Sequence, residues 1–257
     1  TDGSKANIQG IAAGDYQLGT VQSDTMSYAW EGTRAFESTG KVDSFRVVAG
    51  LYAESVQLVT MDPNIKTPAD LKGKAVSIGA PGSGVYFNAI DVLNAAGLTE
   101  NDISAQYQSF ADSADALKDG KIDAAFVVAG APTPAITELC TTNSAYLVPI
   151  DGAVADAMMA SCPFYTTYQI PAGTYPGQDE DVTTVTVKAT LIVSASASED
   201  DVYKLTAAIF DNAADIAKEN GKGAELSLEN ATTGMTAPFH KGAAKYFAEK
   251  GITVDAQ

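Results

Sequence analysis

A glycine-rich turn is the part of this chain whose residue types are best suited to holding a ligand. The apolar run Ala75–Ile78 leads into Gly79-Ala-Pro-Gly-Ser-Gly84, and apolar residues then recur with helical spacing over Val85–Asn94. The first N–H groups of a helix lack intrahelical acceptors and lie at the positive end of the helix dipole. The turn therefore predicts a cradle for a carboxylate or a phosphate. The donors of this cradle would be Gly82, Ser83, Gly84 and Val85. The alternative is a tight strand-to-helix turn without a ligand, which the glycines equally allow.

The residue sequence of this turn does not match either of two nucleotide-binding motifs. A Walker loop needs Lys and then Ser or Thr after its last glycine, and here Val85 and Tyr86 follow. The dinucleotide fingerprint needs a third glycine at the position that Phe87 occupies. The sequence thus predicts no nucleotide cofactor at this turn.

A second turn of similar spelling follows the apolar run that ends at Ala129. Gly130-Ala-Pro-Thr133 repeats the Gly-Ala-Pro element and again opens a helical segment. Ligands of open parallel sheets bind beyond the carboxyl ends of the strands, so both turns fit one site. The hydroxyls of Ser83 and Thr133 would add donors there, or they would serve only as helix N-caps.

Catalytic constellations are scarce in this sequence. The one histidine, His240, precedes the last helical segment, where capping or packing is favoured over catalysis. No CxxC, HExxH or spaced His/Cys cluster is present, and the acidic run Asp179–Asp181 lacks the remaining residues of a calcium loop. We therefore predict a protein that is not an enzyme and that carries neither metal nor cofactor.

Charge restricts the partners. Sixteen Lys and Arg stand against 32 Asp and Glu, a net charge of −16, so nucleic acid is not an expected partner. The two arginines, Arg34 and Arg46, lie in a segment that reads as surface, which makes backbone donors the better candidates for binding an anion.

Strand and helix patterns alternate through the middle of the chain and predict an α/β fold with a mainly parallel sheet. Helix starts are marked by Thr67-Pro-Ala-Asp70 and Ser109-Phe-Ala-Asp112, in which a hydroxyl stands three residues before an acid. The predicted elements are strand 75–78, helix 85–96, strand 104–107, helix 111–119, strand 122–128, helix 132–140 and strand 146–150. A strand at 182–194 and one long helix at 199–219 follow.

The aromatic stretch Pro163–Gly177 separates these two halves. Tyr165, Tyr168 and Tyr175 would either line a ligand cleft with their rings and hydroxyls or pack between elements. The cysteines Cys140 and Cys162 each end a predicted helix, and this spacing allows either a disulfide of an exported protein or two buried thiols.

Four segments together carry a resemblance to a known family. They are Asp70–Gly84, Leu117–Phe126, Ile170-Pro-Ala-Gly-Thr-Tyr175 and Leu228–Gly234. The chain resembles, over nearly its whole length, the TAXI family of solute-binding proteins that serve TRAP transporters. The resemblance implies a two-lobed, periplasmic-binding-protein type II-like α/β fold with a ligand cleft between the lobes. Lobe I would comprise residues 1–73 and 176–257, and lobe II residues 74–175.

The function that the resemblance implies is an extracytoplasmic receptor, in the periplasm or as a lipoprotein on the outer face of the membrane. It would deliver glutamate, glutamine, a 2-oxoglutarate-like acid or another small carboxylate to a membrane permease. Similar proteins begin with a strand, a Gly/Thr/Tyr-rich turn and a helix before the segment that matches Thr1–Ser4, so we expect the first lobe to lack that unit. Its remaining ligand contacts would fall at Gln22, Ser23, Asp24 and Tyr52, where turn or cap roles are the alternative.

Competing classes share this architecture. They are the effector-sensing domain of a transcription regulator, an α/β enzyme with a catalytic His or Cys, and an ABC-type binding protein for nitrate-like or sulfonate-like anions.

Overall fold

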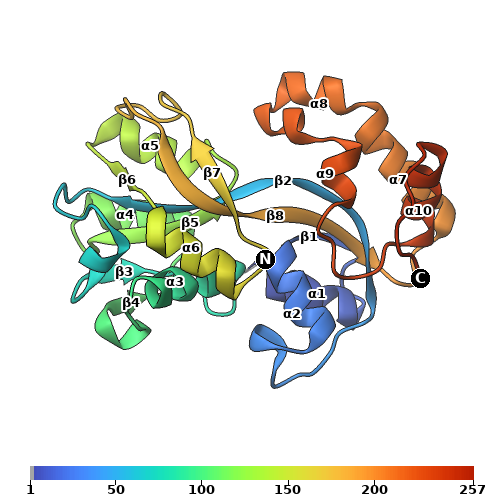
Figure 1. Cartoon of the computed structure of the whole chain (residues 1–257), viewed down its shortest axis with the longest axis horizontal. Coiled ribbons are helices and arrows are strands. Elements are labelled where there is room, and N and C mark those ends of the chain that lie inside the picture. The colour runs from blue at the N-terminus through green and yellow to red at the C-terminus, as the bar shows by residue number, and fades with distance from the viewer. Residues whose placement is uncertain (1–2) are drawn as a thin grey trace. The chain divides into compact units, whose positions relative to one another are not determined.

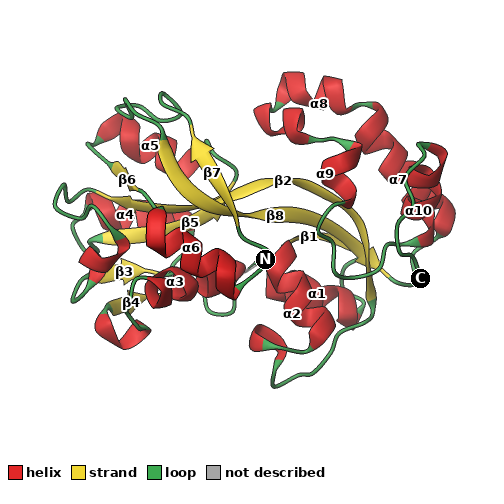
Figure 2. Ribbon diagram, in the orientation of Figure 1, coloured by secondary structure: helices red, strands yellow, loops and turns green. Residues whose placement is uncertain are grey.

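The computed structural model describes residues 3–257, and this part of the chain forms two compact units (Figure 1). Unit 1 comprises Thr1–Ala53 and Lys188–Gln257, and unit 2 comprises Glu54–Val187. Two long strands, β2 (Phe45–Thr60) and β8 (Val182–Ser194), belong to both units (Figure 2). The boundaries of these compact units therefore fall inside continuous strands. Thr1 and Asp2, where the family-like segment begins, lie outside the described residues.

Unit 1 is built on the strand order β1-β8-β2, in which β1 (Leu18–Gln22) pairs antiparallel with β8. Its first helices are α1 (Ser4–Ala13), α2 (Ser23–Glu31) and the short η1 (Arg34–Phe36). Its later helices are α7 (Glu199–Asp211), α8 (Ala213–Glu219), η4 (Gly221–Glu225), α9 (Leu228–Thr232) and α10 (Lys241–Glu249).

The long helix predicted at 199–219 is interrupted. Asn212 leaves the helical conformation with φ −113° and ψ 14°, and its side-chain amide donates to the carbonyl of Ala208 at 2.9 Å. An Asn side chain that satisfies a carbonyl of the last turn is a local alternative to continuing the helix. Two shorter helices, α7 and α8, therefore replace the one predicted.

Unit 2 contains the parallel strands, β3 (Ala75–Ser77), β4 (Ser104–Gln106) and β5 (Ala124–Ala129), in the order β5-β3-β4. β2 pairs antiparallel with β5 and with β6 (Tyr146–Val148), and β7 (Thr166–Ile170) pairs antiparallel with β8. The sheet is thus mixed, whereas the strand and helix alternation predicted a mainly parallel one. The antiparallel pairs of the sheet involve the long strands β2 and β8 and the strands beside them. Local sequence patterns do not predict which strands pair.

The helices of unit 2 are α3 (Gly84–Ala95), α4 (Phe110–Lys118), α5 (Pro134–Thr142) and α6 (Gly152–Ser161), with short turns η2 (Pro68–Leu71) and η3 (Glu100–Asp102). The predicted starts are confirmed at Thr67, whose capping box includes Asp70, and at Ser109, whose hydroxyl accepts the Asp112 N–H. Local hydroxyl and carboxylate chemistry therefore set these starts.

Two cores cover the two faces of the unit 2 sheet, because side chains alternate along each strand. Val56 and Phe126 pack with α3 and α6, whereas Val59 and Val127 pack with α4 and α5. The helix α3 follows β3 and α5 follows β5, so the chain leaves two neighbouring parallel strands toward opposite faces. This divergence is the strand arrangement beside which α/β sheets bind ligands.

Candidate functional site

The carboxyl ends of β3, β4 and β5 meet at one edge of the unit 2 sheet, because the three strands are parallel. The helices that follow them, α3, α4 and α5, all begin at that edge with a hydroxyl residue at the N-cap position, Ser83, Ser109 and Thr133. Three positive helix ends therefore point to the same edge. We call it the carboxyl edge.

The turn that precedes α3 comprises Gly79–Gly84 and is here called the α3 turn. Its backbone geometry requires glycine at two positions. Gly79 has φ 84° and Gly82 has φ 76°, conformations that L side chains rarely adopt. A Cβ on Gly79 would lie 2.8 Å from the Cβ of Val85 and 3.0 Å from the Ser83 hydroxyl. The turn is thus folded tightly onto the start of its own helix.

The donors of the α3 turn are only partly used. The Ser83 hydroxyl accepts the Tyr86 N–H at 3.2 Å, as an N-cap does. In the part of the chain that the structure describes, no acceptor meets the N–H groups of Gly84 and Val85, and both residues are buried. An anion at this turn would supply the missing acceptor.

The α5 turn is occupied by the protein itself. The Tyr175 hydroxyl accepts the Thr133 N–H at 2.9 Å and donates to Oε1 of Gln57. The Thr133 hydroxyl accepts from Nε2 of Gln57 at 3.0 Å and donates to the Gly130 carbonyl at 3.1 Å. Burial raises the pKa of Tyr175, so this hydroxyl stays protonated. Thr133 and Tyr175, both predicted as ligand contacts, are thereby committed to each other and to Gln57.

A buried hydroxyl without a partner lies beside this turn. Ser55 is fully buried, its Oγ has no hydrogen-bond partner among the described residues, and it stands on β2 opposite Ala129, the last residue of β5. It is on the same face of β2 as Gln57, two residues along the strand. A second orphan acceptor, Oε1 of Gln108, follows β4 at the same edge. Unmet polar groups in a buried position are expected where water or a ligand completes them.

Ser55, Gln57 and Gln108 were not among the residues predicted from the sequence. A usable signal existed for the first two, since polar residues alternate with Val56 and Leu58 in a strand that is otherwise apolar. The role of Ser55 and Gln57 could not be predicted, because it depends on their positions relative to Tyr175 and Ala129, which are remote in sequence.

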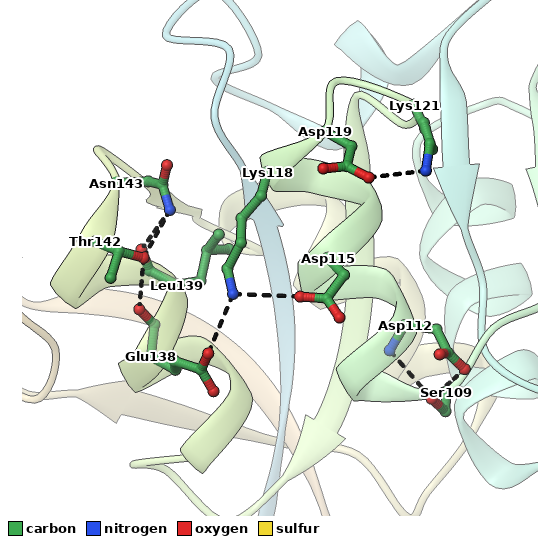
Figure 3. A network of polar contacts seen from close by, with 10 residues as sticks. All are labelled: Ser109, Asp112, Asp115, Lys118, Asp119, Lys121, Glu138, Leu139, Thr142 and Asn143. Atoms are coloured by element: carbon green, nitrogen blue, oxygen red, sulfur yellow. Dashed lines mark hydrogen bonds and ion pairs between the residues drawn. The ribbon is translucent and has the colours of Figure 1, made fainter.

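Lys118 and Lys121 lie away from the carboxyl edge, whereas the Asp112 carboxylate lies at that edge, where it accepts from the Ser109 hydroxyl at 2.6 Å (Figure 3). Lys118, at the last residue of α4, bridges Asp115 at 3.3 Å and Glu138 at 3.2 Å. Lys121 pairs with Asp119 at 2.8 Å, whereas Ser109 opens the helix at its other end. Both arginines belong to unit 1. Backbone amides and hydroxyls are therefore the donors for an anion at the carboxyl edge.

The remaining tyrosines of the aromatic stretch, Tyr165 and Tyr168, pack in the two cores of unit 2. Tyr165 is buried in the α3/α6 core, donates to Asp91 at 2.8 Å and accepts from Asn88 at 2.8 Å. Tyr168 is in β7 and packs against the opposite core. Both arrangements agree with the packing interpretation of these residues.

In unit 1, the predicted contacts Gln22, Ser23 and Asp24 lie where β1 ends and α2 begins. Oε1 of Gln22 is buried and meets no partner within residues 3–257. The Ser23 hydroxyl accepts the Lys188 N–H at 3.2 Å, and the buried Asp24 carboxylate accepts the Thr25 N–H at 2.6 Å. This second strand-to-helix junction therefore also carries one orphan acceptor. Tyr52 lies on β2 and lines a pocket together with Leu51 and Asn220.

Two further predictions are settled by contacts. His240 is the N-cap of α10: its Nδ1 accepts the Gly242 N–H at 3.1 Å, and its Nε2 lies 3.1 Å from the Ala197 carbonyl. Its Nε2 therefore carries the proton of a neutral ring, and desolvation lowers its pKa. The capping interpretation is confirmed.

The disulfide prediction is wrong. Cys140 packs in the α4/α5 core and Cys162 in the α3/α6 core, and neither forms a disulfide. The two side chains lie on opposite faces of one sheet, and a disulfide needs Cα atoms within about 7 Å. The helix ends that suggested pairing are kept apart by the strands between them.

The described residues contain no group of three or more His, Cys, Asp or Glu that could hold a metal ion. Across the same range, no helix is long and apolar enough to cross a membrane.

Comparison with known proteins now defines the class. Residues 1–251 match the NMT1-like family, so the chain belongs to the NMT1-like family. The alkanesulfonate-binding protein SsuA from Xanthomonas axonopodis pv. citri, solved with MOPS, matches with a TM-score of 0.51 and 18% identity. That match covers 97% of this chain and 78% of the other.

A protein from Bordetella bronchiseptica RB50 matches with a TM-score of 0.53 and 19% identity, over 96% of this chain and 76% of the other. The periplasmic aliphatic sulphonate binding protein SsuA from Escherichia coli is 17% identical, with a TM-score of 0.46 over 88% of this chain. This chain spans 60% of the length of that protein. The fold is thus the mixed α/β fold of two-lobed periplasmic solute-binding proteins, as predicted. The TAXI subfamily stays a prediction.

Proposed function

We propose that this protein is an extracytoplasmic receptor that binds a small organic anion at the carboxyl edge of unit 2. The anion accepts hydrogen bonds from the Gly84 and Val85 N–H groups and from the Ser55 hydroxyl. Gly82 supplies the turn geometry and Ser83 the N-cap, while Gly130, Thr133 and Tyr175 form the wall beside the ligand.

The observation that carries this proposal is the orphan hydroxyl of Ser55. A buried serine without a partner costs free energy of about 1–3 kcal/mol, which a bound acceptor would recover. Ser55 lies on β2 opposite Ala129, the last residue of β5, and β5 pairs with β3, the strand that leads to the unused α3 donors. Two independent sets of unmet groups at one edge support a ligand, whereas helix capping alone would account only for Ser83.

The chemistry favours a carboxylate or a sulfonate. Both present several oxygen acceptors to backbone donors, and neither requires an arginine. One charge at a helix end contributes about 0.3–1 kcal/mol, so micromolar affinity, near −8 kcal/mol, requires several contacts together. Within unit 1, Gln22, Ser23 and Asp24 stay candidate ligand contacts by themselves, and the buried Oε1 of Gln22 is an acceptor suited to an amine or hydroxyl.

The transporter partner has two candidates. The resemblance of Asp70–Gly84 and Ile170–Tyr175 to the TAXI family favours a TRAP permease and a carboxylate such as glutamate or 2-oxoglutarate. The structural match to the alkanesulfonate-binding protein from Xanthomonas favours an ABC transporter and a sulfonate. The ligand decides between them.

Calorimetric titration tests the proposal with glutamate, glutamine, 2-oxoglutarate and ethanesulfonate. We expect micromolar binding of at least one anion and a loss of about 5–30-fold in affinity on Ser55→Ala, the worth of one hydrogen bond. Ser104→Ala is the control variant, because Ser104 is the first residue of β4 and therefore lies at the end of that strand away from the carboxyl edge. Equal affinity of the two variants, or no heat with any anion, would contradict this site.

A further inference from the structure

Unit 1 contains a cavity that the proposed solute site does not use. Its volume is about 230 Å³, and it lies between β2, α7, α8 and η4. Four large side chains of these elements and Leu226, which follows η4, line it: Leu51, Tyr52, Ile209, Ile216 and Leu226. Asn220, Lys222 and Gly223 complete the lining. We propose that this cavity, here called the η4 pocket, is a second binding site, for a small uncharged molecule with an apolar body and one polar group.

The walls of the η4 pocket are fixed by contacts within unit 1. The Glu225 carboxylate accepts the Ala53 N–H at 2.7 Å, and the Asn230 side-chain amide donates to the Leu51 carbonyl at 2.9 Å. At Gly223 a Cβ would lie 2.6 Å from the Ala217 nitrogen, so η4 already packs directly on the α8 backbone. Because η4 is held against both β2 and α8, the space is not removed by a simple inward shift of the loop.

The charge arrangement selects against ions. Lys222 is 15% exposed and its ammonium contacts Oε1 of Glu225 at 2.6 Å. Since the cation at the pocket is already neutralised, a bound carboxylate would lose its hydration without gaining an unpaired counter-charge. A neutral ligand avoids this cost, and the exposed amide of Asn220 offers a partner for one polar group.

The size of the cavity sets the size of the ligand. An apolar cavity of about 150 Å³ accommodates benzene. The η4 pocket is larger, so a six-membered ring with one hydroxyl or a short substituent fits. Phenol is therefore a suitable probe, and benzoate is its charged counterpart.

The test is amide NMR on the 257-residue chain titrated with phenol, benzoate and N-acetyl-tyrosinamide. Phenol should shift the amide signals of Tyr52, Gly223 and Leu226, and benzoate should bind at least about tenfold more weakly. Ile216→Trp fills the cavity and should weaken phenol binding about tenfold, whereas Leu18→Trp, at a 51% exposed position of the same unit, should not change it.

If Ile216→Trp does not fold, Leu226→Phe takes its place with the same expected direction. Absence of phenol shifts at these amides, or equal binding of benzoate, would overturn the proposal. Tighter binding of N-acetyl-tyrosinamide than of phenol would also overturn it, in favour of a protein side chain as the occupant. Because these signals come from unit 1, the result is independent of Ser55 and the carboxyl edge.

Discussion

The α3 turn and the α5 turn share the sequence Gly-Ala-Pro, but their hydrogen-bond donors are used differently. Beside α5, the Thr133 N–H and hydroxyl are engaged by Tyr175 and Gln57. At the α3 turn, the Ser83 N–H donates to the Ala80 carbonyl and the Tyr86 N–H to the Ser83 hydroxyl, but among the described residues the Gly84 and Val85 N–H groups meet no acceptor. Two similar local sequences thus produce one self-satisfied turn and one turn with capacity for a ligand. The difference comes from residues that reach α5 from distant parts of the chain.

The largest expected effect is on the α3 turn itself. Gly79→Ala should lower the free energy of unfolding by about 2–4 kcal/mol, because it adds a strained positive φ and a clash with Val85. Urea denaturation followed by circular dichroism measures it.

Gly73→Ala is the matched control for that variant. Gly73 has φ 75°, but no atom lies within 4 Å of the place where its Cβ would stand, so only the conformational cost of about 1–2 kcal/mol should appear. Equal losses in the two variants would show that the close packing of the α3 turn contributes nothing.

Removing a hydrogen bond at the α5 turn should lower the free energy of unfolding by a smaller amount. Tyr175→Phe leaves the Thr133 N–H and the Gln57 oxygen buried without partners, which should destabilise the protein by about 1–3 kcal/mol. Tyr146→Phe, at a 45% exposed position, should change stability by less than about 0.5 kcal/mol. A neutral result for Tyr175→Phe in urea denaturation would mean that the α5 turn is not held by this hydroxyl.

Removing the cap of α3 should have a smaller effect again. Ser83→Ala loses the bond to the Tyr86 N–H and should lower the free energy of unfolding by about 1 kcal/mol, whereas Ser83→Asn should retain most of it. Thermal unfolding of both variants measures the difference. Identical stability of the two would argue that the cap is not formed in solution.

The orphan serine sharpens the comparison most, because its replacement should not destabilise the protein. Ser55→Ala removes the buried hydroxyl that makes no bond, so the free energy of unfolding should stay the same or rise, by up to about 1–3 kcal/mol, while anion affinity falls. Ser77→Ala provides the contrast, since Ser77 is equally buried but bonded to Ser113 at 2.8 Å and should lose about 1 kcal/mol. Both numbers come from urea denaturation without ligand. A loss for Ser55→Ala as large as that for Ser77→Ala would indicate an internal partner and weaken the case for a ligand there.

No effect at all is expected from a reductant. Cys140 lies on the α5 side of the sheet and Cys162 on the α3 side, so no covalent bond couples the two turns. The melting temperature should be the same with and without dithiothreitol. A drop on reduction would require the two faces to be linked in a way that the fold does not allow.

Helix starts and fold class were predictable because their causes are local. Thr67 with Asp70 and Ser109 with Asp112 cap helices through side chains three residues apart, and apolar periodicity marks which faces are buried. Antiparallel pairing of β2 and β8 was not predictable, because strand order is decided by contacts between remote segments. The break at Asn212 had a local cause, but the same residue is compatible with a continuous helix when tertiary packing favours it.

The amino-acid sequence by itself determined the two Gly-Ala-Pro turns, the hydroxyl residues at the N-cap positions of their helices and the shortage of cationic side chains, since these follow from residue type and spacing. Only the tertiary structure decided that Tyr175 and Gln57 occupy one turn, that Ser55 stands unpaired at the same edge, and that the two cysteines face apart. The physical reason is that a hydrogen bond or a cavity is defined by distance in space. Residues separated by long stretches of chain acquire that distance only when the sheet assembles.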